Sequence, residues 1–185
     1  MKSLSLVLLI VAVLISFENI SAQDTNNKRN LTTVDSVNIN KYMGLWYEIA
    51  KIPNSFQDQC LKNTTAEYRL QDDGTVEVIN SCDENDDSRD KATGLARVVD
   101  RKTNAKLEVS FVSIFGWHLF WGDYWIIGLA DDYRYAVVGT PSKKYGWILS
   151  RTARLDDEDL IQVHAILRDN GYNPNDFEMT PQEAD

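Results

Sequence analysis

The segment GLWYEIAKIP (Gly44 to Pro53) alternates as a β-strand does, with Trp46, Glu48 and Ala50 on one face. Its largest apolar side chain stands two residues after a glycine, at the start of the strand. A carboxylate shares the face of that indole. A tryptophan in a strand is usually an ordinary core residue, so the rest of the chain must decide whether Trp46 has a more particular role.

Seven further segments read as strands and are bounded by turn signals such as QDDG, DRKTNA, ADDY and TPSKKYG. The eight predicted strands cover residues 44–52, 62–70, 75–82, 92–100, 106–112, 123–130, 134–140 and 145–151. Short strands at this spacing are typical of a β-sandwich or a β-barrel.

The periodicity becomes helical in DDEDLIQVHAILRDNGY, where one face collects Leu160, Val163, His164 and Leu167. Asp156 or Asp157 can cap this helix, and Gly171 can end it. A single amphipathic helix needs an outer wall to pack on, which favours a barrel over a two-sheet sandwich. We predict an all-β fold: an eight-stranded antiparallel up-and-down β-barrel with a C-terminal α-helix packed on the outside.

Residues 1–22 are typical of a secretory signal peptide. Lys2 precedes the apolar run LSLVLLIVAVLISF, which is shorter than the roughly 18–20 residues of a membrane span, and Ala22 suits a cleavage site. A transmembrane anchor is the alternative. We expect a soluble, exported protein of the bacterial periplasm or the extracellular space. No cysteine precedes Cys60, so we expect no lipid anchor on an N-terminal cysteine.

The remaining chain is expected to form one domain. Residues 23–37 are polar and are predicted to form a loose arm, residues 38–180 the barrel and its helix, and residues 181–185 a tail. The formal net charge of −9 argues against nucleic acid as a partner, because phosphate binding needs clustered Lys and Arg.

The two cysteines of the chain are predicted to form a disulfide. Cys60 precedes the run LKNTTAEYRL and Cys82 ends TVEVINSC, with the turn signal QDDG between these runs. Folding the hairpin about this turn brings both cysteines to its open end. Two free thiols are the alternative.

Three motifs in order resemble the lipocalin family. GLWYEIAKIP resembles its first signature, ADDYRYAVVG (Ala130 to Gly139) its second, with Asp131 in place of a threonine, and WILSRT (Trp147 to Thr152) its third. The amino-acid sequence of these segments is similar to that of the bacterial lipocalins related to apolipoprotein D. The resemblance covers roughly residues 38–180 and implies the barrel predicted above.

The resemblance also implies a role for the indole. In lipocalins, the tryptophan of the first signature closes the base of the barrel and the arginine of the third lies across it, here Trp46 and Arg151. Gly44, Asp132 and Tyr133 are expected to be structural residues of the same base. The sequence leaves two environments open for the Glu48 carboxylate: it can be buried against Tyr68 or Asn80, or a local twist can turn it toward solvent.

Strand alternation predicts the side chains that line the interior. The set mixes small residues with aromatic ones, which favours a ligand cavity over a filled core. The sixth strand is apolar on both faces, and Trp125 is taken as its inward residue. The predicted lining consists of Ala66, Tyr68, Val78, Asn80, Ala96, Val109, Phe111, Trp125, Ala136, Val138, Trp147 and Leu149.

Few of these residues are polar, which suits a long apolar tail with its polar head near the mouth. The related bacterial lipocalins imply a fatty acid or a lysophospholipid. We therefore expect a carrier or scavenger of an acyl lipid, for lipid transport or membrane maintenance. The loop SIFGWHLFWGDYW (Ser113 to Trp125) either packs its aromatic residues over the mouth or exposes them. Exposed residues between Phe115 and Trp121 could touch a membrane or a second subunit.

Other chemistries have weaker support. A lipocalin-type enzyme acting on a lipid or pigment would need a nucleophile such as Cys60, which the predicted disulfide removes; no catalytic residue is proposed. His118 and His164 lack the spacing of a metal site, so no metal or cofactor is expected. A haem or pigment carrier would have only His118 as an axial ligand. Asn30 and Asn63 carry glycosylation sequons whose use depends on the source.

Overall fold

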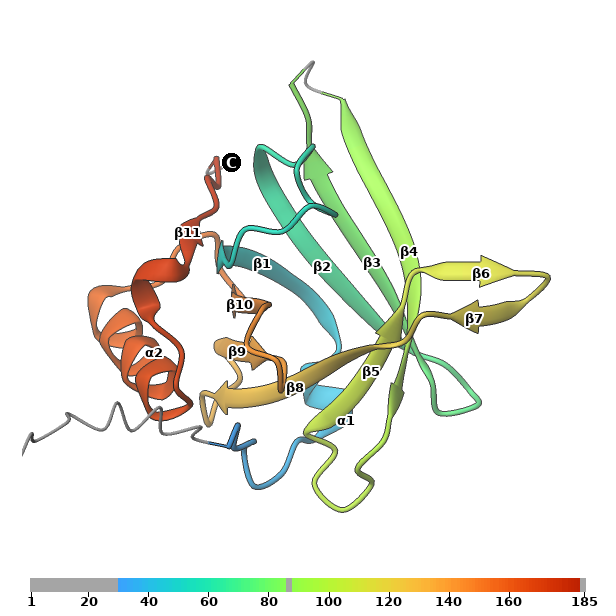
Figure 1. Ribbon diagram of the computed structural model, residues 1–185, viewed down its shortest axis with the longest axis horizontal. Coiled ribbons are helices and arrows are strands. Elements are labelled where there is room, and N and C mark those ends of the chain that lie inside the picture. The colour runs from blue at the N-terminus through green and yellow to red at the C-terminus, as the bar shows by residue number, and fades with distance from the viewer. Residues whose placement is uncertain (1–29, 86–87, 184–185) are drawn as a thin grey trace, which may run out of the picture.

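The computed structural model describes residues 30–85 and 88–183. Its main sheet is antiparallel and closes on itself, because β10 pairs with β1 as well as with β9 (Figure 1). The eight strands of this barrel are β1 (Gly44–Lys51), β2 (Lys62–Leu70), β3 (Val76–Asp83), β4 (Arg89–Val98), β5 (Lys106–Ser110), β8 (Gly122–Leu129), β9 (Tyr135–Gly139) and β10 (Gly146–Ser150). The predicted up-and-down barrel is confirmed.

The structure adds short elements that the sequence pattern did not reveal. They are the helix α1 (Ile39–Tyr42), the hairpin of β6 (Val112–Ile114) and β7 (Trp117–Leu119), the turn η1 (Pro174–Asp176) and the strand β11 (Glu178–Met179), which pairs with β1. The hairpin lies between β5 and β8 in sequence and projects away from the barrel wall (Figure 1). Strand β5 therefore ends earlier than predicted.

Apolar side chains form two clusters because successive residues of a strand face opposite sides of the sheet. In β9, Ala136 and Val138 belong to the interior cluster, whereas Val137 belongs to an outer cluster with Val163 and Leu167. The last two residues lie on α2 (Asp157–Asp169), which packs against the outside of the barrel as predicted.

Helix α2 begins and approaches the barrel for identifiable reasons. The Asp156 side chain accepts a hydrogen bond from the Asp159 amide and caps the helix. At Gly128 of β8, an added Cβ would lie only 2.9 Å from carbon atoms of Ile166 on the helix. The absence of a side chain there lets the helix approach the sheet this closely.

The segments that flank the barrel are held more firmly than predicted. The predicted signal peptide lies outside the described residues. Of the segment expected to be a loose arm, Val34 donates to the Ile126 carbonyl and buried Val37 to that of Thr103, so residues 30–37 follow the barrel wall. In the expected tail, Gln182 donates to the Glu48 carbonyl at 2.8 Å. The predicted loose arm and the predicted tail are both ordered where the structure describes them, because their backbone or amide groups form hydrogen bonds with the barrel.

Cys60 and Cys82 form the predicted disulfide, with their Cα atoms 5.4 Å apart. The bond joins the start of the β2 region to the end of β3. Among the described residues, no helix is long and apolar enough to cross a membrane.

Candidate ligand-binding site

One end of the barrel is closed by Trp46. The indole is fully buried, and its Nε1 donates to the Tyr42 carbonyl at 2.9 Å. The Arg151 guanidinium lies over the ring, with 3.7 Å between Cζ and the ring centroid. Arg151 also donates to four carbonyls, those of Lys41, Tyr42, Met43 and Leu45. The arrangement implied by the family resemblance is therefore present.

Gly44 begins β1 with φ at +94°, a left-handed conformation that a residue with a side chain adopts only at a cost. An added Cβ would meet Arg151 Nη1 at 3.6 Å, which is ordinary contact. The backbone conformation, more than the space, therefore requires a glycine where the chain turns from α1 into the first strand.

The turn between β8 and β9 supports the closed end in two ways. Tyr133 Oη accepts a hydrogen bond from the Asn38 amide at 2.9 Å and so holds the segment that leads into α1. Asp132 is exposed and accepts from Arg134, and this backbone hydrogen bond lowers the pKa of Asp132. Arg134 in turn makes two hydrogen bonds to buried Asp159 of α2, a link that no local sequence pattern predicts.

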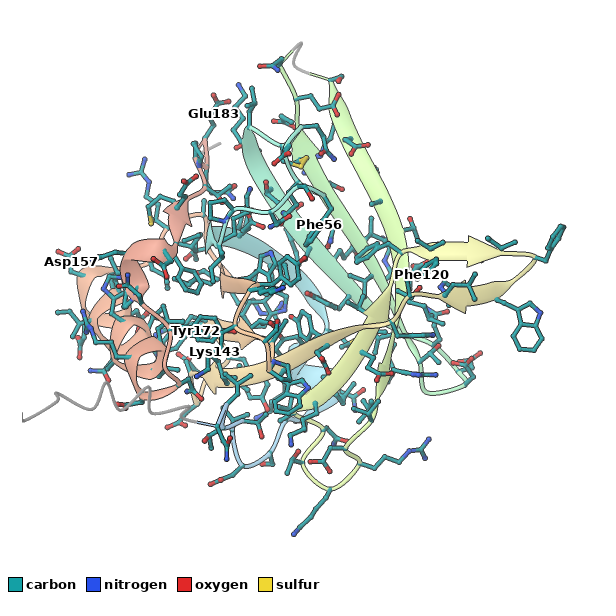
Figure 2. The ribbon with its side chains drawn as sticks, viewed as in Figure 1. Phe56, Phe120, Lys143, Asp157, Tyr172 and Glu183 are labelled. Atoms are coloured by element: carbon teal, nitrogen blue, oxygen red, sulfur yellow. A yellow bond between two sulfur atoms is a disulfide. The ribbon has the colours of Figure 1, made fainter. Side chains whose placement is uncertain are left out.

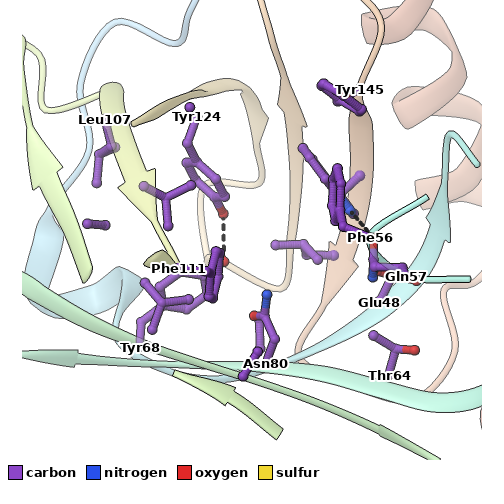
Figure 3. A pocket seen from close by; sticks show the side chains of 18 of the residues that line it. Glu48, Phe56, Gln57, Thr64, Tyr68, Asn80, Leu107, Phe111, Tyr124 and Tyr145 are labelled. Carbon is purple, nitrogen blue, oxygen red and sulfur yellow. Dashed lines mark hydrogen bonds between the residues drawn. The ribbon is translucent and has the colours of Figure 1, made fainter. Parts of the chain in front are cut away.

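Above the Trp46 plug, the barrel encloses a cavity of about 580 Å³ (Figure 3). This volume lies within the roughly 300–1,000 Å³ of small-molecule sites. Nine of the twelve predicted lining residues contact it: Ala66, Tyr68, Val78, Asn80, Ala96, Val109, Phe111, Trp147 and Leu149. Strand alternation thus placed most of the walls correctly.

Three predicted lining residues do not reach the cavity. Trp125 faces outward, where Lys106 Nζ lies 4.1 Å from its ring centroid, so the predicted phase of the sixth strand was wrong. Tyr124 and Ile126 point inward instead. Ala136 and Val138 face the interior but are completely covered by neighbouring side chains.

The uninterrupted run of apolar residues in β8 explains why Trp125 was wrongly predicted to face inward. The segment YWIIGLA gives no polar residue by which to choose a face, and a register shift in β8 between Ile126 and Gly128 interrupts the alternation. The register with β5 decides the question, because Tyr124 pairs with Leu107, which lines the cavity.

Glu48 is buried, and its partners differ from those predicted. Its carboxylate accepts from Thr180 Oγ1 at 2.7 Å and from Gln57 Nε2 at 2.9 Å, and Lys51 Nζ lies 3.2 Å away. Tyr68 and Asn80 are not among its hydrogen-bond partners in the described chain. A register shift between Glu48 and Ala50 turns this part of β1, so that Ala50 joins the outer cluster.

Exposed aromatic residues surround the open end of the cavity. Phe56, on the loop between β1 and β2, packs near Tyr145 and Trp147 with ring centroids 5.4 and 6.4 Å away (Figure 3). Gln57 accepts from the Trp147 indole at 3.1 Å and donates to Glu48, which ties this loop to the barrel. Phe120 of the β7 end also lines the cavity and is 82% exposed.

The β6–β7 hairpin continues this exposed aromatic surface. Phe115 at its tip is 98% exposed and Trp117 is 75% exposed, and neither lines the cavity. The hairpin that carries them projects from the barrel next to Phe120 (Figure 2). The first expectation for this loop, an aromatic cluster that packs over the mouth, is therefore wrong for Phe115 and Trp117. Trp121 behaves differently: it is half-buried under the Arg97 guanidinium.

The described residues contain no group of three or more His, Cys, Asp or Glu side chains that could hold a metal ion. His118 lies on β7 beside Trp121, outside the cavity lining. Cys60 lines the cavity, but the disulfide leaves it without a thiolate. The absence of an enzymatic activity remains a prediction.

Comparisons with known proteins agree with this architecture. Residues 37–182 match the model of the "Lipocalin-like domain" family. The temperature-induced lipocalin-1 of Arabidopsis thaliana is 37% identical over 158 residues, which is 84% of each chain. The outer membrane lipoprotein Blc of Escherichia coli K12 is 34% identical over 170 residues, 91% of this chain and 93% of that one.

Among solved structures, insecticyanin from the tobacco hornworm Manduca sexta superposes with a TM-score of 0.66. The alignment covers 82% of this chain and 84% of insecticyanin at 24% identity, so it supports the fold alone. The family model and the two relatives carry the assignment. The chain belongs to the lipocalin family.

Proposed function

We propose that the protein binds a single-chain acyl lipid, a fatty acid or a lysophospholipid, in the barrel cavity and carries or scavenges it. The observation that carries this proposal is a cavity of about 580 Å³, walled mainly by apolar residues, that opens beside an exposed aromatic hairpin. Lipocalins typically bind small hydrophobic ligands, and relatives such as Blc point toward lipid.

The energetics are sufficient for one alkyl chain. Burying about 14 methylenes at ~0.8 kcal/mol each gives roughly 11 kcal/mol, and association costs about 4 kcal/mol or more. The difference of about 7 kcal/mol corresponds to a dissociation constant of roughly 10 µM. No ionic contact is needed for binding of this strength.

The charges along the cavity favour a lysophospholipid over a free fatty acid. Of the described residues that line it, Glu48, Asp90 and Asp123 are acidic and none is Lys, Arg or His. A fatty-acid carboxylate at the mouth would therefore meet like charge, because Lys51 is already paired with Glu48 and does not line the cavity. A zwitterionic head group carries its own cation and avoids this penalty.

The β6–β7 hairpin supports a function at a lipid surface. Its exposed aromatic residues adjoin the mouth, since Val112, Phe120 and Trp121 also line the cavity. We propose that the hairpin rests on a lipid surface while a ligand enters or leaves, and that the protein is exported, as residues 1–22 suggest. A second copy of the chain is the alternative occupant of this surface.

Native mass spectrometry of protein purified without detergent, together with displacement of a fluorescent fatty-acid probe, tests the proposed function. We expect one bound lipid per chain and displacement by lysophosphatidylcholine at micromolar concentration. If no lipid co-purifies and nothing displaces the probe, the carrier function is wrong. Visible absorbance of the purified protein tests the haem or pigment alternative, which His118 does not support because it lies outside the cavity lining.

Filling the cavity gives a sharper test. Ala66→Trp places an indole in the lining, and each methylene of the chain that it displaces costs about 0.8 kcal/mol, or roughly a fourfold loss of affinity. Leu45→Trp is the control, because Leu45 is exposed on the outer face of the neighbouring strand. Equal affinities of both variants for the probe would place the ligand outside this cavity.

A further inference from the structure

Three tyrosine hydroxyls meet inside the cavity next to its closed end. Tyr124 Oη lies 2.8 Å from Tyr42 Oη and 2.9 Å from Tyr68 Oη, and Figure 3 shows the second of these bonds. All three side chains line the cavity. Tyr42 also packs on the plug, with its ring centroid 5.0 Å from that of Trp46. The cluster therefore marks the deep end of the site.

The cluster has more hydroxyl protons than hydrogen bonds to use them. Each tyrosine carries one hydroxyl proton, so the cluster has three donors, but the two oxygen–oxygen contacts use only two of them. None of the three hydroxyls has another hydrogen-bond partner among the described residues. At least one proton therefore needs an acceptor that the described chain does not supply, and a buried donor without one is costly.

Burial keeps these groups in the donating form. It raises the pKa of Tyr42 and Tyr124 well above the usual value of 10 and that of Tyr68 to about 12. All three remain neutral phenols near neutral pH. The side chains are also held by ring contacts, with centroids 5.6 Å apart for Tyr42 and Tyr68 and 6.2 Å for Tyr68 and Tyr124.

We propose that these three hydroxyls form a subsite for a neutral oxygen acceptor, so that the preferred ligand is a long-chain lipid with a carbonyl group in the end that enters first. The inference rests on the proposed lipid-binding function and specifies it: the chain is oxygenated at its tail, and its polar head stays at the mouth.

A neutral carbonyl suits this end better than a carboxylate. The nearest charges oppose each other, since Glu48 raises the pKa of Tyr68 and Arg151 lowers it. Arg151 lies against Trp46, and neither residue lines the cavity. A buried anion would lack a partner of opposite charge, whereas a ketone oxygen needs only the spare hydroxyl proton.

The test compares lysophosphatidylcholines that carry either a plain hexadecanoyl chain or the same chain with a ketone at carbon 9, 12 or 15. The large zwitterionic head prevents these ligands from entering head first. With the subsite, we expect the ketone that reaches the tyrosines to bind about two- to tenfold more tightly than the plain chain. Without it, every ketone is buried without a partner and binds roughly 5- to 100-fold more weakly.

The matched variant replaces all three tyrosines, as Tyr42→Phe, Tyr68→Phe and Tyr124→Phe together. One substitution is not enough, because the two hydroxyls that remain still have more protons than hydrogen-bond contacts between them. Removing the whole set leaves no unpaired partner, which keeps the cost to folding small. We expect this variant to prefer the plain chain over every ketone, which reverses the order of affinities expected of the wild-type protein. The control is Tyr47→Phe, whose ring belongs to the outer cluster.

The outcomes separate the two proposals. If neither plain nor oxidised chains displace the fluorescent probe, the lipid-binding function itself is wrong. If the plain chain binds and every ketone weakens binding to the wild-type protein, the carrier function stands and the tyrosine subsite is overturned. The wild-type comparison decides this point even if the triple variant fails to fold. A ketone preference that survives in a folded triple variant also overturns the subsite.

Discussion

The two ends of the barrel differ in how completely their groups are paired. At the closed end, Trp46 is fully buried and donates to the Tyr42 carbonyl, and Arg151 lies over the indole while donating to that carbonyl and to three others. On the hairpin beside the mouth, Phe115 and Trp117 are 98% and 75% exposed. Side chains that determine the fold are buried and have their hydrogen-bonding groups paired. Side chains available to a ligand or a surface keep exposed apolar area or an unpaired hydrogen-bond donor. The tyrosine cluster lies deep in the barrel but has one hydroxyl proton without an acceptor, so it belongs with the side chains that are available to a ligand.

The largest effect is expected from Trp46→Ala. Removing a fully buried indole creates a cavity at the floor and leaves the Arg151 guanidinium without its aromatic partner. Large-to-small substitutions of this type lower the free energy of unfolding by about 3–5 kcal/mol. Urea unfolding followed by circular dichroism measures it. Trp117→Ala removes the same side chain at the mouth and is expected to change stability by no more than about 0.5 kcal/mol.

Equal losses in the two tryptophan variants would contradict the contrast between the ends. A small loss at Trp46 would mean that the Arg151 hydrogen bonds alone hold the floor. A large loss at Trp117 would mean that the hairpin packs on the barrel in solution.

Removing the disulfide tests how the mouth is held. The double variant Cys60→Ser, Cys82→Ser removes a covalent bond between residues 22 positions apart. Closing a loop of this length lowers the entropy of the unfolded chain and contributes about 3 kcal/mol to the free energy of unfolding. We expect guanidinium unfolding to show a loss of this size and the ligand to dissociate faster, since both cysteines line the cavity. A loss below about 1 kcal/mol would show that the Gln57 contacts to Glu48 and Trp147 are sufficient.

High pH should destabilise the folded protein through the tyrosine cluster. Burial raises the pKa of Tyr68 from 10 to about 12, so its phenol favours folding fully below pH 10, where the unfolded chain is also protonated. As the pH rises from 10 to 12, the unfolded state loses the proton first, and about 2–3 kcal/mol of stability is lost. Urea unfolding at pH 9 and 12 measures this loss, and a spectrophotometric titration of tyrosine locates the pKa.

The variant with all three tyrosines changed to phenylalanine is the control for this pH dependence. It keeps the other ionisable groups but lacks the cluster, so its stability should fall less between pH 10 and 12. Identical slopes for the two proteins would mean that water reaches the hydroxyls, and the buried cluster would have to be abandoned.

The sequence predicted most of the barrel because its signals are local. Alternation and turn residues gave eight strands, and nine of the twelve predicted lining residues contact the cavity. Trp125 was misplaced because its strand is apolar on both faces and only the register with β5 fixes the phase. The partners of Glu48 could not be found, since Thr180 is 132 positions away and a register shift in β1 decides which way the carboxylate turns.

The smallest effect on stability, and the most informative about the mouth, is expected from the pair Phe115→Ser and Trp117→Ser. Both side chains are exposed, so the free energy of unfolding should change by no more than about 0.5 kcal/mol. Each of these side chains gains roughly 1.5–3 kcal/mol when it is buried in an apolar phase. If the hairpin rests on lipid, binding to phosphatidylcholine vesicles should therefore weaken at least tenfold, and transfer of a fluorescent acyl lipid should slow.

The matched control for the hairpin pair is Ile161→Ser with Met179→Ser, which removes two exposed apolar side chains on the helix side, away from the mouth. It should leave vesicle binding unchanged, because only apolar area next to the opening can contact the lipid that the cavity receives. Unchanged vesicle binding by the hairpin pair, combined with the loss of a concentration-dependent dimer in sedimentation, would assign the surface to a second copy of the chain. The exposed residues at the mouth would then serve assembly, and the ligand would have to enter the cavity from solution.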